Sequence, residues 1–268
     1  MQVVGLSIRD ADRKFDLPGV LTGGLGEERT GLGVGGYPFL MLGIWHEVAV
    51  QTGRALPMDT TTLARYFLAA FLVRQLTVVW VIWEFEYHVV TGRLSPYLLQ
   101  PLDFGWRMLA AHLSEQVARV PFGLILIALF LALYPQAAWL PTPRELILGA
   151  ISIYLAFTLR FLMQYSLAML CFWYERASSL EQLQFLAYLF LSGMVAPLGF
   201  YPAPMRHLLM WTPFPYMLDL PANLLIGHST SVPIGQAMAI VGGWIVAFYL
   251  LNRWLWHRGV RQYSAMGA

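Results

Sequence analysis

The sequence has few charged residues, one lysine and one cysteine, and each scarcity excludes a class of protein. Charged residues make up 12% of the chain and hydrophobic residues 58%, whereas a soluble domain carries about 25% charged residues. The single cysteine, Cys171, excludes a disulfide within the chain and a cysteine metal site. The single lysine, Lys14, lies in no Gly-x-x-x-x-Gly-Lys-Ser/Thr motif, so this chain has no ATPase phosphate-binding loop. A net charge of +2 gives no indication of a nucleic-acid partner.

Catalytic and metal-binding patterns are also missing. The six histidines are scattered without the spacing of metal ligands. His46-Glu47 begins like a zinc-protease motif, but Val50 stands where the second histidine belongs. We therefore predict no catalytic residue, no metal site and no cofactor in this chain.

Two further features have structural interpretations. Ser192 and Gly193 lie in an apolar stretch, where small residues allow helices to pack closely. Glu175 and Glu181 flank Arg176, and we interpret them as a solvated loop surface.

Long apolar stretches dominate the rest of the chain and predict an all-α, polytopic integral membrane protein. About 20 apolar residues in a helix cross the ~30 Å hydrocarbon layer, and the alternating strands of a membrane barrel do not occur. Residues 1–30 are polar, without the apolar core of a signal peptide, so we assign the transmembrane domain to 31–268. We expect about six transmembrane helices, from 34–50 (the weakest), 63–83, 117–134, 145–172, 183–200 and 234–256.

The arginines set the expected orientation, because cytoplasmic loops are enriched in Lys and Arg. With both ends inside, cytoplasmic segments hold eleven basic residues and outer loops three, namely Arg54, Arg144 and Arg206. This predicts that 84–116 faces the cytoplasm and that 135–144 and 201–233 face outward.

The segment 84–116 is the longest predicted inner loop. Ser95 followed by Pro96 is a good helix start, and a second start follows at Asp103. From Trp106 to Val117 the apolar residues share one helical face, which predicts short amphipathic helices along the inner membrane surface. They either dock a soluble partner or lie on the membrane without one.

The segment 197–233 is apolar but holds seven prolines. Proline removes a backbone donor and clashes one turn back, so this segment cannot be one straight span. We predict half-helices at 205–211 and 216–226 that dip into the outer leaflet and are buried by other protein segments.

Polar residues within the spans form a second group of interest: Arg74, Arg160 and Gln164. An arginine at the bilayer centre costs roughly 2.5–3.5 kcal/mol on insertion scales. Arg160 therefore needs an acid on another helix, backbone carbonyls or water in a cavity to offset this cost, and Asp219 and Glu47 are the candidate acids. It is either a point on a substrate path or subunit interface, or an internal clamp.

Several segments together resemble the permease subunits of ABC-2 type exporters. The resemblance covers 37–268, whereas 1–36 is polar and glycine-rich where such permeases begin with an amphipathic helix and a full apolar span. The segments that carry it are GRLSP at 92–96 with LLQPL at 98–102, TPFPY at 212–216, and RWLWHRGVRQYSAMGA at 253–268.

The resemblance implies a cytoplasmic coupling helix between spans two and three and re-entrant helices before the last span. It also implies a second permease subunit, the same or a related chain, and a separate ABC ATPase subunit that binds ATP and Mg, all at the cell (inner) membrane. The residues expected to couple to the ATPase are Glu84, Glu86, Gly92, Arg93, Leu94, Ser95 and Pro96.

Two other functions remain open at this point. An integral membrane enzyme acting on lipid-linked substrates would need clustered acids or histidines at a membrane face, and Glu84, Glu86 and His88 are the only ones that qualify. An assembly factor without transport activity is the third possibility. The substrate and the direction of transport are not encoded in any feature that we recognise.

Overall fold

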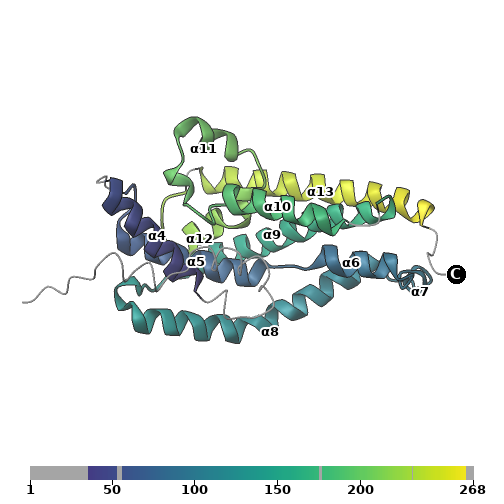
Figure 1. Ribbon diagram of the computed structural model, residues 1–268, viewed down its shortest axis with the longest axis horizontal. Coiled ribbons are helices and arrows are strands. Elements are labelled where there is room, and N and C mark those ends of the chain that lie inside the picture. Colours follow the sequence, from purple (N-terminus) through teal and green to yellow (C-terminus); the bar gives the residue numbers. More distant parts are fainter. Residues whose placement is uncertain (1–35, 53–55, 175–176, 231, 264–268) are drawn as a thin grey trace, which may run out of the picture.

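The structure is a computed structural model that describes residues 36–52, 56–174, 177–230 and 232–263. This part of the chain consists of helices without strands, which confirms the all-α prediction. The long helices run side by side along one axis (Figure 1). The polar segment 1–30, residues 34 and 35 of the first apolar stretch, Glu175 and Arg176 lie outside the described residues.

Four helical segments of the described chain are long and apolar enough to cross a membrane. They are Thr60–Val90, Phe104–Leu133, Pro143–Phe172 and Ile234–Gln262. The chain is thus a multi-pass membrane protein, as predicted. Two of the six expected spans are shorter, since α4 (Tyr37–Thr52) has 16 residues and α10 (Ser178–Leu191) has 14.

The helix predicted at 183–200 ends early, at Leu191, and the reason lies in the residues that follow. Gly193 adopts a φ of 93°, which other residues rarely reach. A Cβ atom on Gly193 would lie 2.5 Å from the Tyr66 hydroxyl oxygen. Gly193 therefore allows close packing, as predicted, but it does so just beyond the end of a helix and not within one.

Several helix starts are encoded by local capping. Asp59 accepts a hydrogen bond from the Thr62 amide at the start of α5 (Thr60–Thr77). Asp103 accepts one from the Gly105 amide (2.9 Å) at the start of α8 (Phe104–Leu133), as its sequence position predicted. Thr142 and Glu145 form a capping box at the start of α9 (Pro143–Ala168), which continues as the 3₁₀ turn η2 (Met169–Phe172).

The structure corrects the expectation of short surface helices in 84–116. α6 (Val81–Val90) continues the apolar segment that begins with α5. α8 is a single helix of 30 residues. The apolar face from Trp106 to Val117 therefore belongs to the first half of a long helix, not to a separate surface helix. Between α6 and α8 lies only one four-residue helix, α7 (Ser95–Leu98).

The proline-rich segment forms short helices, as predicted. They are η3 (Leu198–Phe200), α11 (Ala203–Leu209), η4 (Phe214–Met217) and α12 (Asp219–Leu225). All seven residues of α12 are buried, and α12 packs against α9 and α5. α13 (Ile234–Gln262) is the last long helix of the described chain and packs against α9.

α9 is the central helix and packs against α13, α12, α6 and α5. At one end of the bundle α7 lies near the end of α13 (Figure 1), where the Ser95 and Tyr263 hydroxyl oxygens are 3.3 Å apart. At the other end Trp139, next to the 3₁₀ turn η1 (Pro135–Ala137), donates to the Leu225 carbonyl (3.1 Å). The segments predicted to share a membrane side are thus neighbours, and which side is cytoplasmic stays a prediction.

Candidate functional site

The segment Thr60–Val90 is not one continuous helix. α5 ends at Thr77 and α6 begins at Val81, and at Val78 the backbone is extended, with φ −67° and ψ 135°. The surrounding sequence, Thr77-Val78-Val79-Trp80-Val81, is rich in β-branched residues, which lose side-chain freedom in a helix and favour extended backbone. An interruption inside an apolar span leaves backbone groups that need partners.

Side chains from α8 supply those partners. The Trp80 amide donates to His112 Nε2 (3.1 Å), and Gln116 donates to the Leu76 carbonyl. Arg119 Nη1 donates to the Val78 carbonyl (3.0 Å). His112, Gln116 and Arg119 are spaced at i, i+4 and i+7, so one face of α8 holds the interruption together.

The hydrogen bonds of His112 determine its tautomer. Nε2 accepts from the Trp80 amide, so the ring proton is on Nδ1, which donates to the Met108 carbonyl (2.8 Å). Glu84 Oε2 lies 3.9 Å from Nε2. This pair is not an ion pair, because Nε2 carries no proton in that arrangement.

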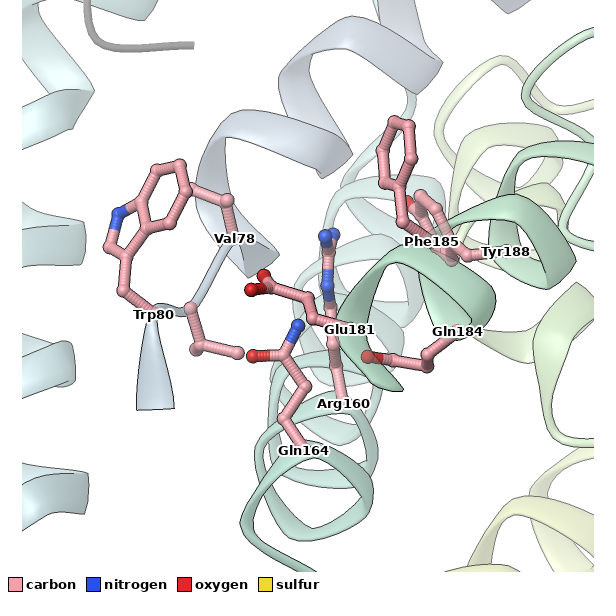
Figure 2. Close-up of a pocket in the computed structure, with 9 residues that line it drawn as sticks. Val78, Trp80, Arg160, Gln164, Glu181, Gln184, Phe185 and Tyr188 are labelled. Atoms are coloured by element: carbon pink, nitrogen blue, oxygen red, sulfur yellow. The ribbon is translucent and has the colours of Figure 1, made fainter. Parts of the chain in front are cut away.

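A polar cavity lies beside the interruption. Its lining includes Val78, Val79 and Trp80 on one side, and Arg160 and Gln164 of α9 on another. The α10 residues that complete it are Glu181, Gln184, Phe185 and Tyr188. Figure 2 shows these side chains converging from α9 and α10 toward the α5–α6 interruption.

Arg160 is buried in this cavity, and its guanidinium carbon lies 4.4 Å from the centre of the Tyr188 ring. A cation over an aromatic face is attracted by the ring quadrupole, more strongly where water is excluded. Arg160 and Gln164 were predicted as intramembrane polar residues, and the structure brings them together. Arg74, the third, does not line the cavity and lies in the last turn of α5 before the interruption.

The acids proposed as partners of Arg160 have other neighbours. Asp219 accepts hydrogen bonds from Tyr66, the Leu198 amide and Asn223, and Glu47 accepts one from Gln51. The acid that lines the cavity with Arg160 is Glu181. The interpretation of Glu181 as a solvated loop residue is therefore wrong, because α10 begins three residues before it and turns it inward.

The predicted coupling residues divide into two groups. Glu86 accepts from the Ser178 amide (2.7 Å) and so caps α10 from outside. Leu94 is fully buried, and Gly92, with a φ of 72°, turns the chain between α6 and α7. These residues have internal structural roles.

The remaining coupling residues lie nearer the surface. Arg93 is exposed, with its guanidinium carbon 5.1 Å from the Tyr87 ring centre. Pro96 is exposed and Ser95 half-buried beside Tyr263, so Ser95 begins α7 without capping it. Glu84 is half-buried near His112.

The acids and histidine required by the membrane-enzyme hypothesis do not converge. Glu86 binds Ser178, Glu84 lies near His112, and the His88 ring packs against Tyr97 and Phe104. Among the described residues no group of three His, Cys, Asp or Glu side chains lies close enough to hold a metal ion.

Comparison with known families decides the class of protein. A family model described as ABC-2 family transporter protein matches residues 56–267. The chain belongs to the ABC-2 transporter family. A search of curated proteins and a search of solved structures found no match. An ABC-2 permease is the transmembrane component of its transporter and not the ATPase, and its family implies an ATPase subunit as partner.

Sequence reasoning found two polar residues of the cavity in this ABC-2 permease, Arg160 and Gln164. It missed Glu181, Gln184 and Tyr188, although their i, i+3 and i+7 spacing on α10 places them on one face. It also missed the role of the α8 residues that hold the interruption. The segment 84–116, which contains His112 and Gln116, was interpreted as an inner loop with short surface helices, and Arg119 was placed at the edge of the next span. The same spacing rule applied to His112, Gln116 and Arg119 would have found them.

Proposed function

We propose that this ABC-2 permease is one of two transmembrane subunits of an ATP-driven exporter in the inner cell membrane. A separate ATPase subunit, which binds ATP and Mg, docks at the end of the bundle that carries α7. The second permease subunit is the same or a related chain. Membership in the family supports an ATPase partner in general. The exposed apolar residues at α7 support docking at that end of the bundle.

The observation that carries the docking place is an exposed apolar tip on a firmly held turn. Leu99 is 89% exposed, and Leu98 and Leu102 beside it are also exposed. Leu94 anchors this tip in the core, and the Leu94 amide donates to the His88 carbonyl (2.9 Å). An apolar tip beyond the membrane-spanning helices gains stability when a partner removes it from water.

Outward-facing apolar surface on the long helices supports the multi-subunit arrangement. In α8 and in α13 only 11% of the residues in the most apolar 18-residue stretch are buried within the chain. Such surfaces fit lipid or another transmembrane subunit. The function as a lipid-acting enzyme gains no support from the geometry.

The docking place is tested with Leu99→Asp, matched by Leu140→Asp at the opposite end of the bundle, where Leu140 is 96% exposed. Each variant is co-expressed with the ATP-binding subunit of the transporter and purified through a tag on the permease. We expect Leu99→Asp to lose most of the ATPase subunit and Leu140→Asp to retain it, because a buried unpaired charge opposes docking. Equal recovery in both variants would contradict docking at α7.

A further inference from the structure

The cavity beside the α5–α6 interruption contains polar atoms that the described residues do not satisfy. Gln164 Oε1, Gln184 Oε1 and the Tyr188 hydroxyl have no hydrogen-bond partner within the described chain. Their side chains are 3%, 9% and 1% exposed, so bulk solvent does not reach them. All three side chains line the same cavity (Figure 2).

Amide orientation does not remove this deficit. Exchanging the oxygen and nitrogen of a glutamine side chain is a choice that the hydrogen-bond network must justify. After such an exchange the amide nitrogen would occupy the unsatisfied position, and it would need an acceptor there. A small group that both donates and accepts hydrogen bonds would satisfy these atoms in either orientation of the amides.

The size of the cavity selects that group. It offers about 20 Å³, and a bound water needs roughly 10–15 Å³ by the same kind of measure, together with two to four polar partners. The three unsatisfied atoms supply those partners. A sugar, lipid headgroup or peptide is too large for this space.

We propose that this cavity is an intramembrane water site, in which bound water is hydrogen-bonded to Gln164, Gln184 and Tyr188. The site lies beside the Arg160 guanidinium and against the extended backbone at Val78. Water there lowers the cost of keeping a charge within the membrane domain. It also provides exchangeable hydrogen bonds where two helical segments meet, so the α5–α6 angle can change without stranding a buried polar group.

Radiolytic hydroxyl-radical labelling tests the site, because radicals formed from bound water oxidise the aromatic rings next to it. The full chain is labelled in lipid nanodiscs on the millisecond timescale. Tyr66 is the internal control, because it is 0% exposed, is also a tyrosine, and does not line this cavity. We expect Tyr188 to be oxidised several-fold faster than Tyr66, and equal slow rates would overturn the proposal.

A variant pair tests which side chains hold the water. Gln184→Leu removes a cavity partner, and Gln182→Leu makes the same change at an exposed position of the same helix. We expect Gln184→Leu to lower Tyr188 oxidation to the Tyr66 rate and Gln182→Leu to leave it unchanged. If Gln184→Leu folds and Tyr188 is still oxidised rapidly, the assignment is wrong. If it does not fold, the comparison of Tyr188 with Tyr66 in the parent protein decides.

Discussion

Two interruptions of the helical backbone in the described part of the bundle satisfy the freed polar groups differently. At Val78–Trp80 three separate side chains of a neighbouring helix, α8, bond to the backbone. Next to the segment from Ser192 to Leu218, the Asp219 carboxylate alone accepts hydrogen bonds from three surrounding donors. Both arrangements obey the rule that irregular backbone in a membrane protein must be buried and bonded.

The Asp219 arrangement is compact. Its carboxylate accepts from the Tyr66 hydroxyl (2.9 Å), the Leu198 amide (3.1 Å) and Asn223 Nδ2 (2.9 Å). The Asp219 amide donates to the Ser192 carbonyl (3.0 Å), which ties the end of α10 to the start of α12. Because the whole of α12 is buried, this interruption has little room to move.

The arrangement at Val78–Trp80 is looser. Gln116 and Arg119 reach the backbone through long side chains with several rotatable bonds, and a polar cavity lies alongside. Long side chains keep their hydrogen bonds over a range of backbone positions, whereas a buried carboxylate among three donors does not. We therefore expect the Asp219 interruption to hold the fold, and the Val78–Trp80 interruption to accommodate changes in helix angle during transport.

Loss of Asp219 should have the largest effect. Asp219→Ala leaves the Leu198 amide and Asn223 Nδ2 without their acceptor, and each such group costs about 1–3 kcal/mol. The Tyr66 hydroxyl keeps the Gly193 carbonyl (2.9 Å) as its acceptor. We expect little folded protein by size-exclusion chromatography in detergent and a strongly lowered melting temperature. Asp219→Asn keeps one acceptor oxygen and should be intermediate. A parent-like melting temperature in Asp219→Ala would remove the proposed difference between the two interruptions.

The sequence predicted the fold because hydropathy and helix caps are local signals. Six apolar stretches, the cap at Asp103 and the broken character of 197–233 can all be recognised from residue type and spacing alone. The interruption at Val78–Trp80 was missed because its residues are as apolar as the helix around it, so hydropathy does not change there. The true neighbours of Arg160 were missed because pairing between α9 and α10 depends on tertiary packing, which spacing within one helix does not reveal.

Loss of His112 should have an intermediate effect. His112→Leu leaves the Trp80 amide without an acceptor, at a cost of about 1–3 kcal/mol. The effect is smaller than in Asp219→Ala because one donor loses its acceptor and not two. His112→Gln is the matched control, since its side-chain oxygen can accept the same hydrogen bond. We expect a clear fall in melting temperature for His112→Leu and partial recovery for His112→Gln. The role of His112 would be refuted if leucine and glutamine had the same effect.

Loss of Arg119 should have the smallest effect on stability. Its side chain is 24% exposed and divides its donors between the Val78 carbonyl and Glu115, one turn earlier on α8. Arg119→Met removes one hydrogen bond, to the carbonyl of the partly buried Val78, so we expect a loss of about 0.5–1.5 kcal/mol. Arg119→Lys keeps a single donor and should lie closer to the parent. The informative measurement is the distribution of distances between spin labels at Gln100 and Leu140, two exposed positions at opposite ends of the bundle. A looser interruption predicts a broader distribution of distances in Arg119→Met than in Arg119→Lys, with melting temperatures nearly equal.

The contrast between the two interruptions would fail if Arg119→Met destabilised the protein as strongly as Asp219→Ala. In that case the Val78–Trp80 interruption would also be a rigid clamp.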